Sequence, residues 1–172
     1  ISGAIDLELM EVLEGTLVFD YVYSHNLTPS RLESSHHMDY CLSGKDSDYI
    51  DSIIQYFETA QNYLSEIDRK IYFDPCFGFS KTREQNHLLL KNCAEVFNRL
   101  NMPLVYGISR KSFLRFPKDL NSKDFFEQKV LDSMQTVLFT NLLNSYKFEL
   151  VFRVHDLASV TAIRNIESMY ES

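Results

Sequence analysis

The sequence has no tryptophan and only 3 cysteines, 5 glycines and 4 prolines in 172 residues. So little glycine and proline excludes collagen-like and low-complexity chains, and a hydrophobic content of 45% excludes intrinsic disorder. No apolar run approaches the roughly 18 residues of a membrane span, so we expect no membrane partner. The cysteines, Cys41, Cys76 and Cys93, are odd in number and unrelated in spacing, which is typical of free thiols in the cytoplasm.

Positively charged residues are also fewer than negatively charged ones: 17 Lys and Arg compared with 24 Asp and Glu give a formal net charge of −7. A nucleic-acid-binding protein is basic overall or along one stripe, so we expect no nucleic-acid partner. The length favours a single domain, and a chain of this size buries enough surface to fold without a disulfide or metal.

Short apolar runs alternate with longer amphipathic stretches. The runs predict strands at 16–24, 70–74, 102–109 and 148–156, and the stretches predict helices at 5–14, 46–67, 83–100, 123–145 and 157–170. Helical crossovers between short buried strands imply a parallel α/β sheet. Either a doubly wound open sheet or part of a (β/α)8 barrel fits. A complete barrel takes about 250 residues, so spacing alone slightly favours the open sheet.

The apolar positions of each long helix predict its buried face. In the helix at 83–100 the inward residues are expected to be Leu89, Cys93, Val96, Phe97 and Leu100. In the helix at 123–145 they are expected to be Phe126, Val130, Met134, Val137, Leu138 and Leu142.

Titratable and polar residues collect where all four strands end, which is where α/β folds bind ligands. They are Ser24, His25, Asp74, Ser109, Arg110, Lys111, Arg153, His155 and Asp156. Cations at or just after these ends would make one rim basic: Lys81, Arg83, Arg110, Lys111, Arg115, Arg153 and His155. Such a rim suits a small anion such as a phosphate ester, with Asp74 accepting ligand N–H groups. The alternative is that these are solvated loop residues.

The loop DPCFGFSKT (74–82) is the most distinctive segment of the chain. Gly78 permits a tight turn. Phe77 and Phe79 either line a pocket or tuck beneath neighbouring helices. Elsewhere, His36 and His37 with Asp39 and Cys41 match no zinc spacing, so no metal site is predicted there. His25 either points toward the ligand or is a hydrogen-bonded structural histidine.

Three segments together resemble one family. DPCFGFSKTREQNHLLL (74–90), GISRKSFL (107–114) and RVHDL (153–157) are similar, in this order, to the DPGxGFxKT, GxSRKS and RVHDV motifs of dihydropteroate synthase. The resemblance implies a (β/α)8 TIM barrel of which this chain supplies roughly strands five to eight. Residues 1–172 would then be the C-terminal half of a single pterin-binding barrel domain, which replaces the open sheet as the expected fold.

The resemblance also implies a reaction in folate biosynthesis. A hydroxymethyl-dihydropterin pyrophosphate condenses with p-aminobenzoate and releases pyrophosphate, in a homodimeric cytoplasmic transferase that sulfonamides target. Mg²⁺ is the implied cofactor, with its protein ligand in the half of the family's sequence that is not represented here. Catalytic roles fall on Lys111, Arg153 and His155, of which the last two would hold the pyrophosphate.

Substrate-binding roles implied by the resemblance fall on four further residues. Asp74 would hydrogen-bond the pterin ring, and Gly107 would let that ring approach the backbone. Phe79 would wall the aminobenzoate pocket, and Ser112 would lie near its carboxylate. Cys76 and Ser24 depart from the family, which usually has Gly and Met there.

We do not expect the chain to catalyse alone, because four strands leave two open sheet edges and the motifs of the first four family strands are missing. The first alternative is a non-catalytic remnant that binds pterin or assembles with a missing N-terminal half. The second is a pterin-dependent methyltransferase, which the SRKS and RVHD segments disfavour because methyl transfer releases no pyrophosphate.

Overall fold

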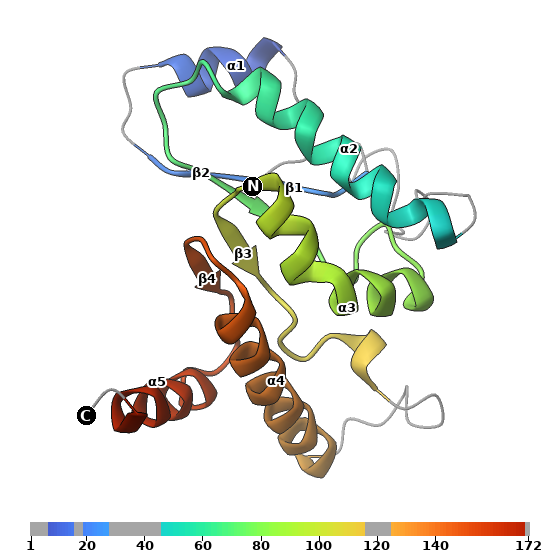
Figure 1. The fold of residues 1–172 in the computed structure, drawn as a ribbon, viewed down its shortest axis with the longest axis vertical. Helices are drawn as coiled ribbons and strands as arrows, with labels where there is room; N and C mark the ends of the chain where they lie inside the picture. Colours follow the sequence, from blue (N-terminus) through green and yellow to red (C-terminus); the bar gives the residue numbers. More distant parts are fainter. Residues whose placement is uncertain (1–6, 16–18, 28–45, 116–124, 171–172) are drawn as a thin grey trace.

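The computed structural model describes residues 7–15, 19–27, 46–115 and 125–170. Strands and helices alternate along the chain, as predicted (Figure 1). The strands are β1 (Tyr21–Ser24), β2 (Ile71–Asp74), β3 (Leu104–Tyr106) and β4 (Leu150–Phe152). The α-helices are α1 (Leu7–Glu14), α2 (Asp46–Leu64), α3 (Arg83–Leu100), α4 (Phe125–Ser145) and α5 (Ala158–Tyr170), and a 3-10 turn, η1, spans Ser112–Leu114.

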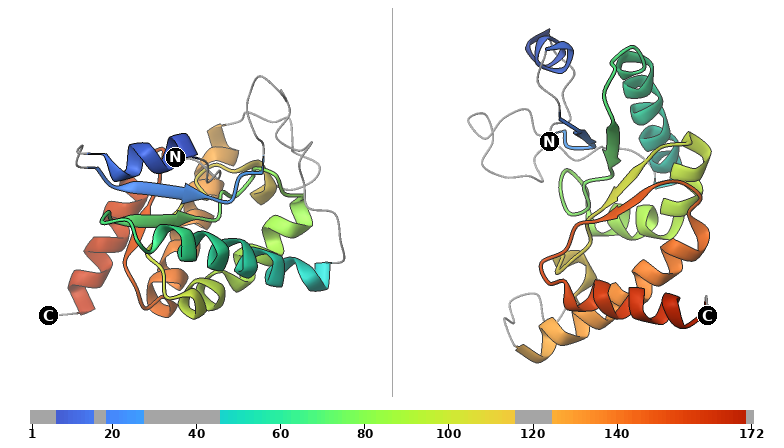
Figure 2. Two further views of the ribbon diagram at one scale, coloured as in Figure 1. Left: turned by 90° about the horizontal axis from the view of Figure 1, so that it is seen from above. Right: turned by 90° about the vertical axis from the view of Figure 1, so that its left-hand side faces the viewer.

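The four strands form one parallel sheet in the order β1-β2-β3-β4. Each crossover therefore moves one strand further in the same direction. A doubly wound sheet reverses its order at a switch point, so the expectation drawn from spacing alone is wrong. In the right-hand view of Figure 2 the helices α2, α3 and α4 follow one another along one side of the strands, which is the winding of a (β/α) barrel.

The core lies between this helical layer and the sheet. Phe57 of α2 is fully buried, with its ring centroid 6.3 Å from Tyr23 of β1, 5.6 Å from Phe73 of β2 and 5.1 Å from Phe97 of α3. The inward face predicted for α3 is confirmed, since all five of its residues are buried. One aromatic cluster thus joins the first two strands to α2 and α3.

Helix α3 has a defined start. Thr82 is its N-cap and forms a capping box with Gln85, in which each side chain bonds the other residue's backbone N–H. The helix ends at Leu100 and is capped by Asn101, whose backbone is left-handed at φ 58°. The loop between β2 and α3 is therefore confined to residues 75–82.

The inward face predicted for α4 is correct only in part. Leu142 is buried and Leu138 packs against the core, as predicted, whereas Val137 is 60% exposed and Val130 and Met134 are half-buried. Among the α4 side chains that the structure describes, Leu131, Gln135 and Phe139 are buried but were not predicted. The Phe126 side chain lies outside the described part of the chain. Apolar residues occupy more than one side of α4, so periodicity alone could not select the side that meets the sheet.

Among the described residues, no helix is long and apolar enough to cross a membrane.

We predict that Phe57→Ala lowers the free energy of unfolding by about 3–5 kcal/mol, because it empties the centre of the aromatic cluster. The control is Tyr63→Ala on the same helix, where the side chain is 61% exposed and the change should stay within about 0.5 kcal/mol. Urea unfolding of both variants measures the difference. Equal effects would contradict the placement of the core.

Candidate functional site

A buried carboxylate stands at the carboxyl end of β2. Asp74 is fully buried, and its Oδ1 accepts a 2.7 Å hydrogen bond from the backbone N–H of Cys76. Its Oδ2 lies 3.1 Å from Nη1 of Arg153, which follows β4 two strands away. The parallel order brings these residues together, because the carboxyl ends of all the strands meet at one edge. The two oxygens of Asp74 thus face a backbone donor and a guanidinium.

Burial is the strongest influence on Asp74 and raises its pKa above the ordinary value. The Arg153 guanidinium opposes that rise, followed by the Cys76 hydrogen bond and the charges of Lys111 and Lys81. Burial has the opposite effect on the Lys111 ammonium and lowers its pKa. The negative charge of the Asp74 carboxylate is therefore stabilised by nearby cations rather than by water.

Lys111 and Phe79 form the outer part of the site. Lys111 Nζ lies 4.5 Å from the centroid of the Phe79 ring, a cation–π contact. Phe79 is 38% exposed, whereas Phe77 is fully buried. Phe77 is thus buried against neighbouring rings, which agrees with the second alternative. Phe79 is partly exposed, and its place in a pocket stays a prediction. Gly78, at φ 82°, packs against the Lys111 side chain, since a Cβ there would lie 3.3 Å from Lys111 Cδ.

Arg153 also lies against a glycine. A Cβ on Gly107 would lie 2.9 Å from both Nε and Nη2 of Arg153, so a side chain there would have to displace this flexible guanidinium. Sequence reasoning assigned Gly107 to ligand approach and did not find this contact. The pairing of the neighbouring strands β3 and β4 could have revealed this contact, because it places Gly107 and Arg153 side by side.

His155 is held by Ser109, which the sequence placed at a strand end without a specific role. The hydroxyl oxygen of Ser109 accepts from the His155 backbone N–H at 3.2 Å and lies 3.0 Å from His155 Nδ1. Both His155 and Arg153 were predicted inside a strand, but β4 ends at Phe152, so they belong to the segment after it. Ser112 is exposed and begins η1, directly after Lys111.

The predicted basic rim is smaller than expected. Lys81 is 1% exposed and donates to backbone carbonyls, so it faces no ligand. Arg110 pairs with Asp132 of α4, with 3.3 Å between Nε and Oδ1, and Arg83 donates to the carbonyl of Arg115. Carbonyl groups and a helix carboxylate compete for these cations, which sequence spacing could not reveal. Lys111, Arg153 and His155 follow the ends of β3 and β4, and their roles stay predictions.

His25 is not the hydrogen-bonded structural histidine of the second alternative, and the first, that it points toward the ligand, stays a prediction. It is fully buried, and among the described residues neither ring nitrogen has a hydrogen-bond partner. Its ring packs 4.5 Å from that of Tyr56. Burial, with the nearby Lys81 charge, lowers its pKa to about 2, so the imidazole is neutral. His36, His37, Asp39 and Cys41 lie outside the described part of the chain.

The described residues offer no set of ligands for Mg²⁺. No group of three or more His, Cys, Asp or Glu side chains comes together among them. The buried carboxylate of Asp74 is already engaged by Arg153 and the Cys76 amide. These residues therefore do not fit a resident Mg²⁺ by themselves, and we assign no step of chemistry to a metal on them.

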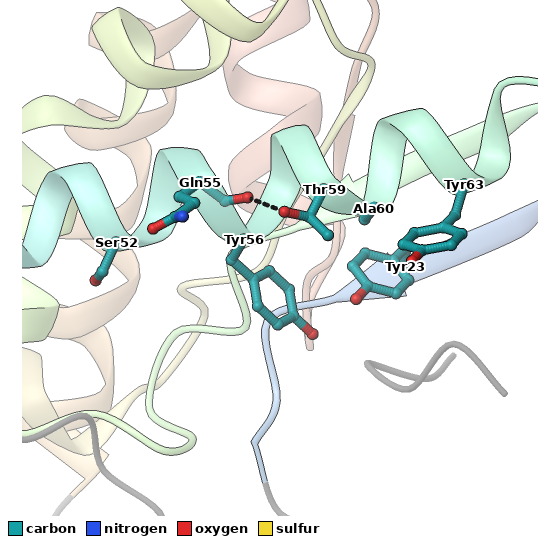
Figure 3. A pocket seen from close by; sticks show the side chains of 7 residues that line it. All are labelled: Tyr23, Ser52, Gln55, Tyr56, Thr59, Ala60 and Tyr63. Atoms are coloured by element: carbon teal, nitrogen blue, oxygen red, sulfur yellow. Dashed lines mark hydrogen bonds between the residues drawn. The ribbon is translucent and has the colours of Figure 1, made fainter.

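A cavity of about 390 Å³ lies elsewhere, along the flank of α2 (Figure 3). It is lined by Tyr23 of β1 and by six α2 residues, Ser52, Gln55, Tyr56, Thr59, Ala60 and Tyr63. None of the seven site residues predicted from the sequence lines it. The cavity is therefore distinct from the cluster around Asp74.

Fold and site together define a class: a (β/α) protein with a cluster of charged side chains at the carboxyl ends of parallel strands, where such folds bind ligands. The family model described as "Pterin binding enzyme" matches residues 19–141, well over half of the chain. The chain belongs to this family. The match includes the segments with Asp74, Phe79, Gly107, Lys111 and Ser112, whereas Arg153 and His155 lie beyond it.

Curated relatives and solved structures agree with this assignment. Dihydropteroate synthase of Escherichia coli K12 is 30% identical over 100 residues, which are 58% of this chain and 32% of that protein. The Synechocystis enzyme is 41% identical over 71 residues, 39% of this chain and 24% of its own. The matched segments thus span a third or less of these relatives.

The fold matches a crystal structure of dihydropteroate synthase from Thermus thermophilus in complex with 6HMPPP. The TM-score is 0.73 at 23% identity, and the match covers 98% of this chain and 62% of that one. A structure from Anaplasma phagocytophilum, with bound 6-hydroxymethylpterin-monophosphate, gives a TM-score of 0.64 at 22% identity and covers 86% of this chain and 54% of that one. These likenesses establish a shared (β/α) fold.

We predict a pH dependence from Asp74. Because its folded pKa lies above the ordinary 3.8, the unfolded chain releases this proton first as pH rises. The contribution of Asp74 to stability therefore falls from about pH 4 upward. Asp74→Asn cannot ionise, so its free energy of unfolding relative to the wild type should rise between about pH 4 and pH 7. Urea unfolding at several pH values tests this, and a relative fall would mean that Arg153 outweighs burial.

A second prediction concerns Cys76, whose backbone is left-handed at φ 54° although it carries a side chain. The left-handed conformation costs a side-chain-bearing residue about 1–2 kcal/mol. Cys76→Gly should therefore be about 1 kcal/mol more stable than Cys76→Ala, which equally lacks the thiol. Urea unfolding compares the two, and equal stability would contradict the strain.

Proposed function

We propose that this chain is the part of a dihydropteroate synthase that supplies barrel strands five to eight. The reaction would join the amine of p-aminobenzoate to a hydroxymethyl-dihydropterin pyrophosphate and release pyrophosphate. The observation that carries the proposal is the convergence of Asp74, Lys111 and Arg153 from three neighbouring strand ends. A buried acceptor beside two cations suits a substrate with a nitrogen-rich ring at one end and a pyrophosphate at the other.

Asp74 would accept hydrogen bonds from the N–H groups of the pterin ring. Its Oδ2 is buried and faces the guanidinium of Arg153 at 3.1 Å. Ring N–H groups could take over that contact, because they too are donors in a plane. Arg153, whose side chain is 42% exposed, would then turn outward to the pyrophosphate.

Departure of pyrophosphate develops negative charge on the leaving group, so catalysis requires cations placed there in advance. Arg153 and His155 would meet that charge, with His155 oriented through Ser109. Lys111 would contact the pterin and border the aminobenzoate pocket, whose wall is the open Phe79 ring. Gly107 and Ser112 would line the same space. No nucleophile on the protein is needed for this step.

Several features of the whole protein remain part of the proposal. They are its homodimeric state, its cytoplasmic location, its inhibition by sulfonamides and its use of Mg²⁺. A metal ligand would have to come from outside the described residues. Support for a reducing compartment comes from Cys76 and Cys93, which are free and buried.

The first experiment reads the coding DNA upstream of the Ile1 codon. An open frame that encodes further (β/α) units defines the full-length protein, in which activity is then measured. A stop codon there would favour the alternative, a non-catalytic remnant. Pterin binding without turnover by the full-length product would favour it too.

We predict that Arg153→Ala in the full-length protein lowers kcat by about a hundredfold, because it removes charge stabilisation from the leaving group. Lys111→Ala should also reduce kcat/KM strongly. The matched control is Lys91→Ala, an exposed lysine on α3. Pyrophosphate release measures the rates, and unchanged activity of both site variants would overturn the proposal.

A further inference from the structure

The loop between β2 and α3 folds around a buried ammonium group. Lys81 is 1% exposed. Its Nζ donates to the carbonyl oxygens of His25 at 3.0 Å, Cys76 at 3.2 Å and Phe79 at 3.0 Å. A lysine is rarely buried this fully, since its charge loses hydration that polar partners must replace. Three carbonyl oxygens match the three N–H groups of an ammonium.

These bonds join two segments that lie far apart in the sequence. Cys76 and Phe79 follow β2, whereas His25 follows β1. The same junction has two further bonds: Leu27 N–H donates to Ser80 Oγ at 3.0 Å, and Ser80 Oγ lies 3.1 Å from Asn26 Oδ1. Lys81 and Ser80 therefore fix the loop to the end of the neighbouring strand.

The backbone of the loop is not one that this sequence adopts readily. Cys76, Gly78 and Ser80 are left-handed, at φ 54°, 82° and 53°. Two of the three carry side chains, and such conformations persist only where the surroundings enforce them. The carbonyl groups of Cys76 and Phe79, which bind Lys81, are part of the same loop backbone. An ammonium that binds both carbonyls opposes relaxation of the loop.

The loop also supplies the inner and outer parts of the candidate site. The Cys76 N–H fixes the Asp74 carboxylate, and the Phe79 ring meets Lys111. We propose that Lys81 is a positioning residue, whose buried ammonium holds loop 75–82 against the end of β1 and thereby sets the places of Asp74 and Phe79. Only the effect on substrate rests on the proposed function; the effect on the loop does not.

The first test uses the wild-type 172-residue chain and a water-soluble acetylating reagent. Lys81 should react about tenfold or more slowly than Lys91, which is exposed on α3, because modification requires local opening. Peptide mass spectrometry resolves the two sites. Equal rates would overturn the proposal without any substitution.

The second test is hydrogen exchange of Lys81→Met, which keeps the length of the side chain and removes its donors. Exchange within residues 75–82 should accelerate about tenfold, while the buried amides of α3 keep their protection. Lys91→Met is the control and should change neither. Equal acceleration in α3 would make Lys81 a general stabilising residue, and no acceleration would make it dispensable; either result contradicts a positioning role.

The third test measures pterin affinity and kcat of Lys81→Met in the full-length protein. Because Asp74 is displaced with the loop, affinity for the pterin substrate should fall about tenfold, with the protection of the α3 amides unchanged. Unchanged affinity would overturn the effect on substrate. If the wild-type protein itself neither binds pterin nor turns over, the proposed function fails, whereas the acetylation and exchange results still decide the role of Lys81.

Discussion

The ion pair between Asp74 and Arg153 is the interaction on which the site depends, because it joins the ends of two strands that are not neighbours. A carboxylate buried this fully keeps its charge only with compensation, which Arg153 and the Cys76 amide provide. Gly107 lies against the same guanidinium, which a side chain at that position would have to displace. This ion pair thus joins the ends of β2 and β4 next to Gly107, which follows β3.

A second buried charge lies in the same loop. The Lys81 ammonium donates to three backbone carbonyls. The two charges act on the loop from opposite ends, since Asp74 begins it and Lys81 precedes the capping box of α3. A short loop with left-handed residues at Cys76 and Ser80 is held in this way.

Much of the fold could be predicted because burial imposes a clear periodicity on α2, α3 and the strands. The face of α4 could not, since apolar residues occupy several sides of that helix and only the sheet selects Leu131 and Phe139. The strand order could not be predicted from the spacing of the elements either, because one-directional and doubly wound sheets share the same alternation of strands and helices. Family motifs led to the correct barrel-type winding, with which the parallel order of β1 to β4 agrees.

By itself the sequence determined the element types, the strand ends that carry polar residues and the family motifs, since these depend on local order along the chain. The tertiary structure decided which cations face the site. Lys81, Arg83 and Arg110 look equivalent to Lys111 and Arg153 in the sequence, yet carbonyl groups and Asp132 capture the first three. Charged side chains pair with groups that lie close to them in space, and these distances are set only once the strands have paired.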